Sequence, residues 1–216
     1  MPNPPSPPAS SAAPPDLIVR GKRVITPEGE RAAAVHVRNG AIIAITAFDE
    51  SPKAVPVHEA GDAVVMPGIV DTHVHINEPG RTEWEGFSTA TRAAAAGGVT
   101  TLIEMPLNSI PATTTAAAFR EKLAAAAGKL SVDTGFWGGV VPGNIAELRP
   151  LWDAGVFGFK CFLVPSGVDE FASVNEDDLR AALPELAALH APLLAHAELP
   201  GPIEEATAKL PKSASP

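Results

Sequence analysis

The sequence is poor in cysteine, in basic residues and in long apolar runs, and each shortage removes a class of protein. Cys161 is the only cysteine, so an internal disulfide framework is excluded and a reducing, cytoplasmic compartment is expected. No apolar run is long enough to span a bilayer. The 16 lysines and arginines against 25 aspartates and glutamates give a formal net charge of -9. This balance argues against nucleic acid or an anionic membrane surface as the main partner.

Four segments of different composition follow one another along the chain. Residues 1–15 are rich in Pro, Ser and Ala, with no basic residue and no apolar centre, so they predict a disordered leader and not a secretory signal. In residues 16–65 short apolar segments alternate with turns, including the hairpin signal Asn39-Gly40. We expect the N-terminal part of a small β-sandwich-type module there. Residues 66–199 alternate strands with helices, and the proline-containing residues 200–216 are expected to form an irregular tail.

The segment after Met66 repeats a strand followed by a helix. The predicted strands are residues 69–75, 100–105, 132–140, 158–164 and 192–198. Such a repeat favours a parallel sheet with helices outside it, closed either as a doubly wound sheet or as a (β/α)₈ barrel. No Gly-rich phosphate fingerprint follows the first strand, which counts against a dinucleotide-binding sheet. A barrel has eight strands in about 250 residues, so the sequence predicts a partial TIM barrel with about five of its eight strands.

Two of the predicted helices carry local signals that concern their ends. Asn144, with Glu147 three residues on, predicts a capping box for a helix that runs to Ala154. Pro150 and Pro184 fall inside two predicted helices. Because proline lacks the amide donor, both are expected to kink or shorten their helices.

Histidines stand near the ends of two predicted strands. Side chains of a strand alternate in direction, so Asp71, His73 and His75 point to one side. Two imidazoles one strand repeat apart can reach one metal ion, for which neutral imidazole is a common ligand. The alternative is a pair of ordinary core or surface histidines, and the HxH pattern alone does not exclude it. His196 lies near the end of the fifth predicted strand, where barrel enzymes place their reacting groups.

Lys160 lies in the middle of the fourth predicted strand. Alternation allows it to face the barrel axis while Phe159 and Cys161 pack against helices. A bare cation is costly to bury there. One solution is a partner carboxylate, such as Asp71 or Glu104. The other is carboxylation by CO₂ to a carbamate, whose two oxygens can bridge two metal ions about 4 Å apart. Three histidines at neighbouring strand ends favour the bridge.

Three motifs carry a resemblance to a known family. Residues 77–87 (NEPGRTEWEGF), 105–109 (MPLNS) and 158–162 (GFKCF) resemble the cyclic amidohydrolases of the amidohydrolase superfamily, and among them the allantoinases. The similarity runs from about Leu17 to Glu198, and these motifs are specific to the group.

The resemblance implies a (β/α)₈ barrel beside a small β-sandwich, with two divalent metal ions, usually zinc, although such ligands also accept cobalt or manganese. It implies that His73 and His75 bind one metal ion, that a carboxylated Lys160 bridges both, and that His196 binds the other. The implied reaction is hydrolytic opening of the hydantoin ring of allantoin to allantoate by a metal-activated hydroxide. Assemblies of this family are commonly homotetramers.

The chain also departs from the family pattern. The family carries a further histidine ligand and a catalytic aspartate on later strands, and residues from the C-terminal part complete its β-sandwich. Neither site residue can be assigned here, so no catalytic residue is predicted. The missing general base is worth typically about 10²–10⁴-fold in rate, and a partial barrel exposes strand edges. We expect a truncated or split enzyme that is inactive as an isolated chain.

Two asparagines are candidates for substrate binding. Dihydroorotase relatives carry an arginine at the position of Asn77, where it pairs with the substrate carboxylate, and an amide cannot replace that charge. Allantoin has no carboxylate, so Asn77 favours allantoin over dihydroorotate. Asn108 is a second candidate for hydrogen bonds to substrate, and both asparagines also suit turns or caps. Another cyclic amidohydrolase, such as a hydantoinase or dihydropyrimidinase, and a non-catalytic assembly subunit remain alternatives.

Overall fold

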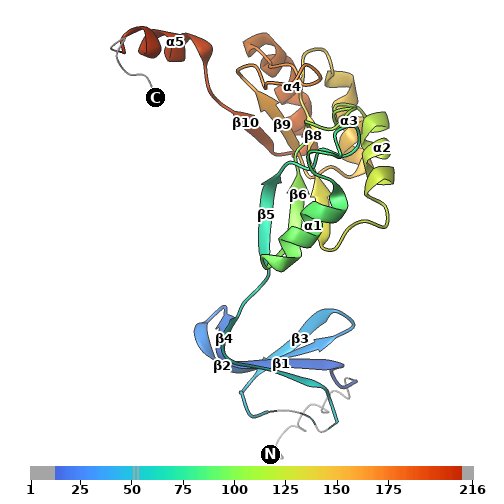
Figure 1. Ribbon diagram of the computed structural model, residues 1–216, viewed down its shortest axis with the longest axis vertical. Coiled ribbons are helices and arrows are strands. Elements are labelled where there is room, and N and C mark those ends of the chain that lie inside the picture. Colours follow the sequence, from blue (N-terminus) through green and yellow to red (C-terminus); the bar gives the residue numbers. More distant parts are fainter. Residues whose placement is uncertain (1–12, 51, 53, 211–216) are drawn as a thin grey trace, which may run out of the picture. The chain divides into compact units, whose positions relative to one another are not determined.

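The computed structural model describes residues 13–50, 52 and 54–210 (Figure 1). The chain divides into two compact units, Met1–Pro67 and Gly68–Pro216. Most of the leader expected at residues 1–15, namely residues 1–12, lies outside the described residues, as do residues 211–216 of the expected tail.

The first unit contains one four-stranded sheet in the order β3-β2-β1-β4. Its strands are β1 (Leu17–Thr26), β2 (Gly29–Arg38), β3 (Ala41–Thr46) and β4 (Val57–Val65). The β1–β2 and β2–β3 pairs are antiparallel, whereas β4 runs parallel to β1. Asn39 and Gly40, with φ of 51° and 76°, connect β2 to β3, so the predicted hairpin is confirmed.

The core of this first sheet is small. It is built on the buried residues Val24, Ala33 and Val35. Ile42 on β3 is 66% exposed. Among the described residues of this unit the strands form a single layer, so a second sheet of the expected sandwich is not seen there.

The second unit alternates strands with helices, as the sequence predicts. Its strands are β5 (Ile69–Val74), β6 (Val99–Glu104), β7 (Asp133–Phe136), β8 (Gly138–Gly139), β9 (Phe159–Phe162) and β10 (Leu193–His196). Its helices are α1 (Phe87–Ala96), α2 (Ala116–Ala126), α3 (Ile145–Ala154), α4 (Glu176–Leu189) and α5 (Pro200–Ala208). The strands form two three-stranded sheets in the orders β5-β6-β7 and β8-β9-β10, and every pair within them is parallel.

The strand predicted at residues 132–140 is divided into β7 and β8 at Trp137. The Trp137 amide donates to the Glu104 carbonyl at the end of β6, with N···O 2.9 Å, whereas the Gly138 amide donates to the Gly158 carbonyl before β9, also at 2.9 Å. The chain therefore changes its hydrogen-bonding partner from one sheet to the other at this point. Gly139 allows the Phe171 ring, from the loop after β9, to pack directly on the backbone, because a Cβ at Gly139 would lie 2.4 Å from this ring.

Two apolar clusters lie on opposite faces of these strands. The larger cluster joins strands to α1–α4, which cover one side of the sheets in Figure 1, and it includes Phe87, Phe119, Phe159 and Leu186. Cys161 belongs to it as well and is fully buried. The smaller cluster contains side chains from the opposite face and from the loops that follow the strands: Met105, Leu107, Ala112, Trp137, Phe162 and Phe171. Full burial of one such large side chain stabilises the fold by about 1.5–3 kcal/mol.

The capping box predicted at Asn144 and Glu147 is wrong. The Asn144 side chain accepts from the Val141 amide and donates to the Thr114 and Gly139 carbonyls. Glu147 accepts from the Ala116 amide at the start of α2. Both polar side chains thus satisfy groups of the neighbouring loop and helix, which become available only when α2 and α3 pack together.

Neither internal proline ends its helix. Helices α3 and α4 both continue past the prolines inside them, Pro150 and Pro184. The irregular tail predicted from residue 200 is also wrong over its first part, because Pro200–Ala208 form α5. Pro200 lies in the first turn, where no intrahelical amide bond is lost. No described helix is both long enough and apolar enough to cross a bilayer.

Candidate metal centre

His73 and His75 stand at the carboxyl end of β5. Their ring centroids are 5.4 Å apart. Val74 packs against the larger apolar cluster and Ile76 belongs to it, so alternation turns the two imidazoles away from the helices. The β5–β6 register is irregular between Asp71 and Val74, and the Asp71 carboxylate accepts from the His73 amide at 3.0 Å. This contact lies within the irregular part of the β5–β6 register.

Lys160 and His196 come from the adjacent parallel strands β9 and β10. Register pairs Lys160 with Leu194 and Phe162 with His196. The Phe162 ring stacks on the His196 imidazole with centroids 4.9 Å apart, and the Lys160 Nζ lies 4.8 Å from the same ring centroid. A cavity of about 600 Å³ is lined by His73, Lys160 and residues 193–198. Three of the four predicted metal ligands therefore share one cavity.

Lys160 is only 4% exposed and has no carboxylate partner in the part of the chain that the structure describes. Glu104 forms an ion pair with Lys122 instead, with Nζ···Oε2 2.6 Å. The carboxylate of Asp71 binds the His73 amide. The alternative of an ion pair between Lys160 and either carboxylate is thus wrong. Burial lowers the pKa of the Lys160 amine, because the charged form loses its hydration.

His75 carries a buried ring nitrogen without a partner. Its Nδ1 has no hydrogen bond among the described residues. Burial lowers the pKa of His75, and the positive charges of His73, Lys160 and Lys122 add to the effect. His75 therefore remains neutral near pH 7, which is the form that binds metals. A buried polar atom without a partner is costly, so this nitrogen fits a site that holds a metal ion.

The donor set is unusual in one respect. Within the described residues, no three His, Cys, Asp or Glu side chains gather closely enough to hold a metal ion. His196 is more exposed than Lys160, and its Nε2 lies 3.4 Å from Glu198 Oε1. A multi-ligand centre at this place thus requires Lys160 to supply a ligand in addition to the imidazoles.

Asn77 and Asn108 do not line this cavity. Asn77 is 7% exposed, and its Oδ1 has no hydrogen-bond partner among the described residues. Its backbone forms a turn, because the Asn77 carbonyl accepts from the Arg81 amide at 2.9 Å. Asn108 has φ of 75°, and its carbonyl accepts from Arg81 Nη1 at 2.8 Å. Both backbones lie in turn or loop segments, and the Asn77 Oδ1 is buried outside the cavity.

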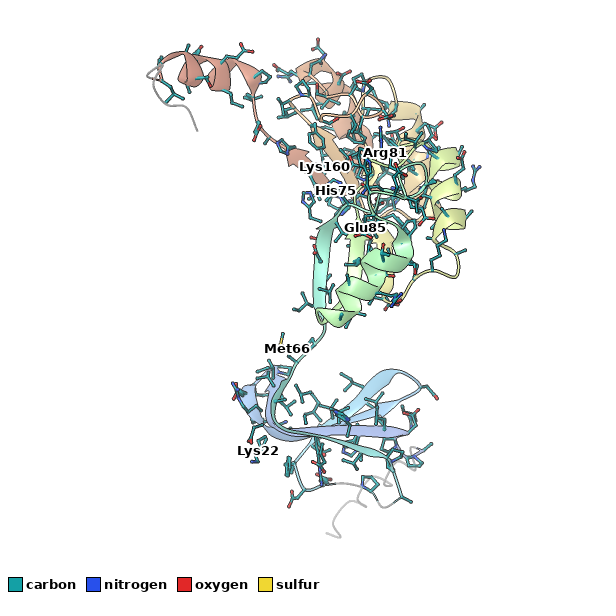
Figure 2. The ribbon with its side chains drawn as sticks, viewed as in Figure 1. Lys22, Met66, His75, Arg81, Glu85 and Lys160 are labelled. Carbon is teal, nitrogen blue, oxygen red and sulfur yellow. The ribbon has the colours of Figure 1, made fainter. Side chains whose placement is uncertain are left out.

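Arg81 is a residue of this region that the sequence does not single out. Besides the Asn108 carbonyl, it contacts Glu170 with Nη2···Oε1 3.0 Å, and its guanidinium lies 5.0 Å from the Trp84 ring centroid. These contacts join the loops after β5, β6 and β9. Figure 2 labels Arg81 together with His75 and Lys160 in the second unit. No local pattern could have found the pairing, since Glu170 is 89 residues away.

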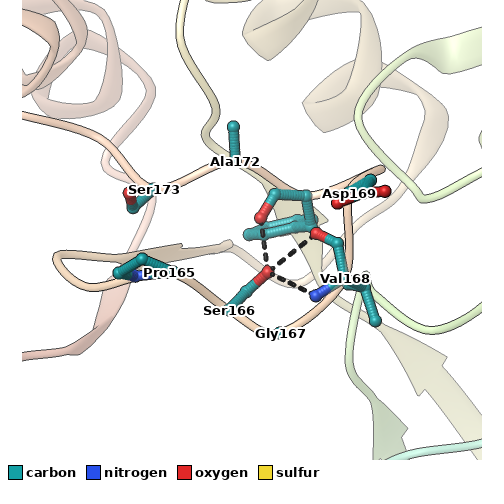
Figure 3. A pocket seen from close by; sticks show the side chains of 8 residues that line it. Pro165, Ser166, Gly167, Val168, Asp169, Ala172 and Ser173 are labelled. Carbon is teal, nitrogen blue, oxygen red and sulfur yellow. Dashed lines mark hydrogen bonds between the residues drawn. The ribbon is translucent and has the colours of Figure 1, made fainter.

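A separate pocket of about 400 Å³ lies in the loop after β9 and is lined by residues 165–169 and 171–173 (Figure 3). Ser166 closes this loop on itself, because its Oγ donates to the Phe171 carbonyl at 2.5 Å and accepts from the Val168 amide at 3.3 Å. None of the predicted metal ligands lines this pocket.

The chain is similar to several known proteins. Residues 64–215 match the model of the family described as Amidohydrolase family. An allantoinase of Streptomyces avermitilis is 56% identical over 186 residues, which is 86% of this chain and 42% of that protein. A mitochondrial allantoinase of Aquarana catesbeiana is 49% identical, covering 84% of this chain and 38% of that protein.

Among solved structures, L-hydantoinase (dihydropyrimidinase) from Arthrobacter aurescens aligns with a TM-score of 0.81 at 38% identity. This alignment covers 88% of this chain and 42% of that one. The chain thus spans about two fifths of the length of the relatives that it matches.

Proposed function

Since this chain belongs to the Amidohydrolase family, we propose that it carries part of a metal-dependent hydrolase that opens the cyclic amide of allantoin to form allantoate. The allantoinases of bacterial and animal origin that it matches support this substrate. The observation that carries the proposal is Lys160, a buried strand lysine without a carboxylate partner in the described residues, on the same cavity as His73 and His196.

The strand order supports a partial (β/α)₈ barrel for residues 66–199. A doubly wound sheet reverses direction at a switch point, whereas strands of a barrel follow one another in sequence order. The orders β5-β6-β7 and β8-β9-β10 are both sequential, and the strand divided at Trp137 connects them. In this interpretation β5 and β10 are the ends of an arc, and their outer edges receive the remaining strands of the barrel.

Two divalent metal ions, with zinc as the first choice, complete the proposed site. His73 and His75 would bind one ion, and His196 would bind the other. Carboxylated Lys160 would bind both ions. The ions would supply Lewis acidity toward the scissile carbonyl and lower the pKa of water. Lys160 is suited to carboxylation because its neutral amine can attack the carbon of CO₂. A C–N bond forms, the nitrogen releases a proton, and the resulting carbamate carries one negative charge.

The chain's own residues would also orient the substrate. The Asn77 Oδ1, buried without a hydrogen-bond partner in the described residues, can accept a hydrogen bond from an N–H of a ureido or hydantoin group. An amide at this position disfavours a substrate carboxylate, which an arginine would bind. Asn108 is the second candidate, held by Arg81 through its backbone carbonyl. The wall formed by Phe162 and Leu194 would exclude water from one side of the site.

The test combines metal analysis with detection of the carbamate. The purified 216-residue chain is incubated with zinc and ¹³C-labelled bicarbonate, beside Lys160→Ala. We expect zinc binding and a carbamate ¹³C signal from the native chain, and neither the signal nor a second bound ion from the variant. A variant that keeps two tightly bound ions and the signal would overturn the role of Lys160.

Activity is tested on the chain alone and after mixing with a complementary C-terminal segment from a relative. We expect no turnover by the isolated chain, and allantoate formation by the mixture. A panel of allantoin, hydantoin, dihydropyrimidine and dihydroorotate separates the substrates. The likeness to L-hydantoinase favours hydantoinase activity as the second candidate, which preferential hydrolysis of hydantoin would establish.

The assembly and compartment are part of the same proposal. We expect a homotetramer in the complete enzyme, measurable by light scattering. Cys161 is buried and unpaired, which supports a reducing, cytoplasmic compartment. If the isolated chain binds a relative and alters its assembly without adding turnover, it acts as a non-catalytic subunit instead.

A further inference from the structure

Glu104 and Lys122 form a buried ion pair between β6 and α2. Glu104 is the last residue of β6 and Lys122 lies on α2. Both side chains are 0% exposed, and the Nζ···Oε2 distance is 2.6 Å. Buried pairs of this kind contribute little to stability compared with apolar residues of the same volume, because desolvation offsets their attraction. The pair therefore calls for an explanation other than stability alone.

Its position coincides with the end of the β5–β6 ladder. The Met105 amide donates to the Val74 carbonyl at 2.8 Å, and the strands separate beyond this bond. There Lys122 Nζ donates to the Met105 carbonyl at 3.3 Å. The Ile76 backbone N–H lies beside the Glu104 carboxylate, although Glu104 Oε1 has no partner at hydrogen-bonding geometry among the described residues. Lys122 thus provides a hydrogen-bond partner for a backbone carbonyl just where the chain leaves the sheet.

The segment that faces this pair carries the candidate ligands. Ile76 directly follows His75 and precedes Asn77. We propose that Glu104 and Lys122 are positioning residues that hold the backbone after β5, so that the imidazoles of His73 and His75 face Lys160. This inference rests on the proposed metal centre.

The test uses two matched double variants of the full chain. In Glu104→Gln/Lys122→Met, the amide oxygen can still face the Ile76 N–H, and no charge is buried. In Glu104→Leu/Lys122→Met, the charge and the acceptor are both absent. Neither variant leaves an unpaired buried charge, so both are expected to fold, as checked by circular dichroism and urea unfolding. A single variant would leave one buried charge unpaired, so the loss of stability could not be separated from the loss of positioning.

Zinc affinity is measured by competition with a chelator, and the His73 and His75 ring signals by NMR without metal. We expect the Leu/Met variant to bind zinc about 10–100-fold more weakly, as is typical when the support of metal ligands is removed. Its ring signals shift, while the Gln/Met variant stays within about threefold of the native chain. Equal zinc affinity and unmoved ring signals in the Leu/Met variant would overturn the inference.

The two measurements separate this inference from the proposed function. If the native chain binds no zinc, the proposed metal centre fails, but the ring signals of the metal-free variants still decide the positioning role. If both double variants weaken zinc binding equally, the acceptor facing Ile76 is not responsible, and the positioning role fails while the metal centre stands.

Discussion

Replacing Lys160 with methionine changes one buried amine and leaves the shape of the side chain nearly unchanged. Lys160 is 4% exposed, and burial disfavours its charged form, so keeping the amine at this position costs about 1–3 kcal/mol. The contact of Nζ with the Phe162 ring returns about 0.5–2 kcal/mol. Methionine removes the cost of burying the amine and replaces the cation–π contact with a sulfur–aromatic contact. Without metal or bicarbonate, the free energy of unfolding should therefore rise by about 1–2 kcal/mol.

The assay is urea unfolding, followed by circular dichroism in bicarbonate-free buffer that contains a chelator. Lys209→Met, at the exposed C-cap position after α5, is the matched control and should change the free energy of unfolding by less than about 0.5 kcal/mol. In zinc and bicarbonate the order of stability should reverse, because the native chain gains more free energy of ligand binding than the variant does. A Lys160→Met chain that is less stable than the native chain in the chelator buffer would refute the reasoning, since it would mean that the amine has a stabilising partner.

Three further expectations concern pH, loop order and metal. Burial raises the pKa of Glu104 to about 7, so the folded state binds the proton more tightly than the unfolded state, and stability is lost as pH rises from about 4.5 to 7. The loss amounts to about 3 kcal/mol at most, and urea unfolding of Glu104→Gln/Lys122→Met should lack this slope. Arg81→Lys should speed amide exchange several-fold in residues 163–175, because lysine cannot contact Asn108 and Glu170 together as arginine does. Glu170→Gln should have a smaller effect. Equal exchange rates in the native chain and both variants would contradict the bridging role of Arg81. Zinc at about 100 times its Kd should stabilise the native chain by about 2.7 kcal/mol, and a chelator should reverse the gain in a thermal unfolding scan.

Local patterns in the sequence determined much of the secondary structure. The strand and helix alternation after Met66, the Asn39-Gly40 hairpin and the opposite directions of Lys160 and Cys161 depend on residues close together in the chain. Backbone preferences and side-chain alternation act over such short distances. The start of α5 at Pro200 was misjudged because proline disrupts the interior of a helix but is tolerated in its first turn.

Tertiary structure alone decided how the polar groups pair. The sequence offers Glu104 as a partner for Lys160, yet the packing of α2 on β6 gives Glu104 to Lys122 and leaves the Lys160 amine without a carboxylate. Asn144 and Glu147 bind the neighbouring loop and helix, and Arg81 reaches Glu170 from another loop. The reason is physical: a buried charge or amide takes whichever partner the closed chain brings within about 3 Å, and separation along the sequence does not encode that distance.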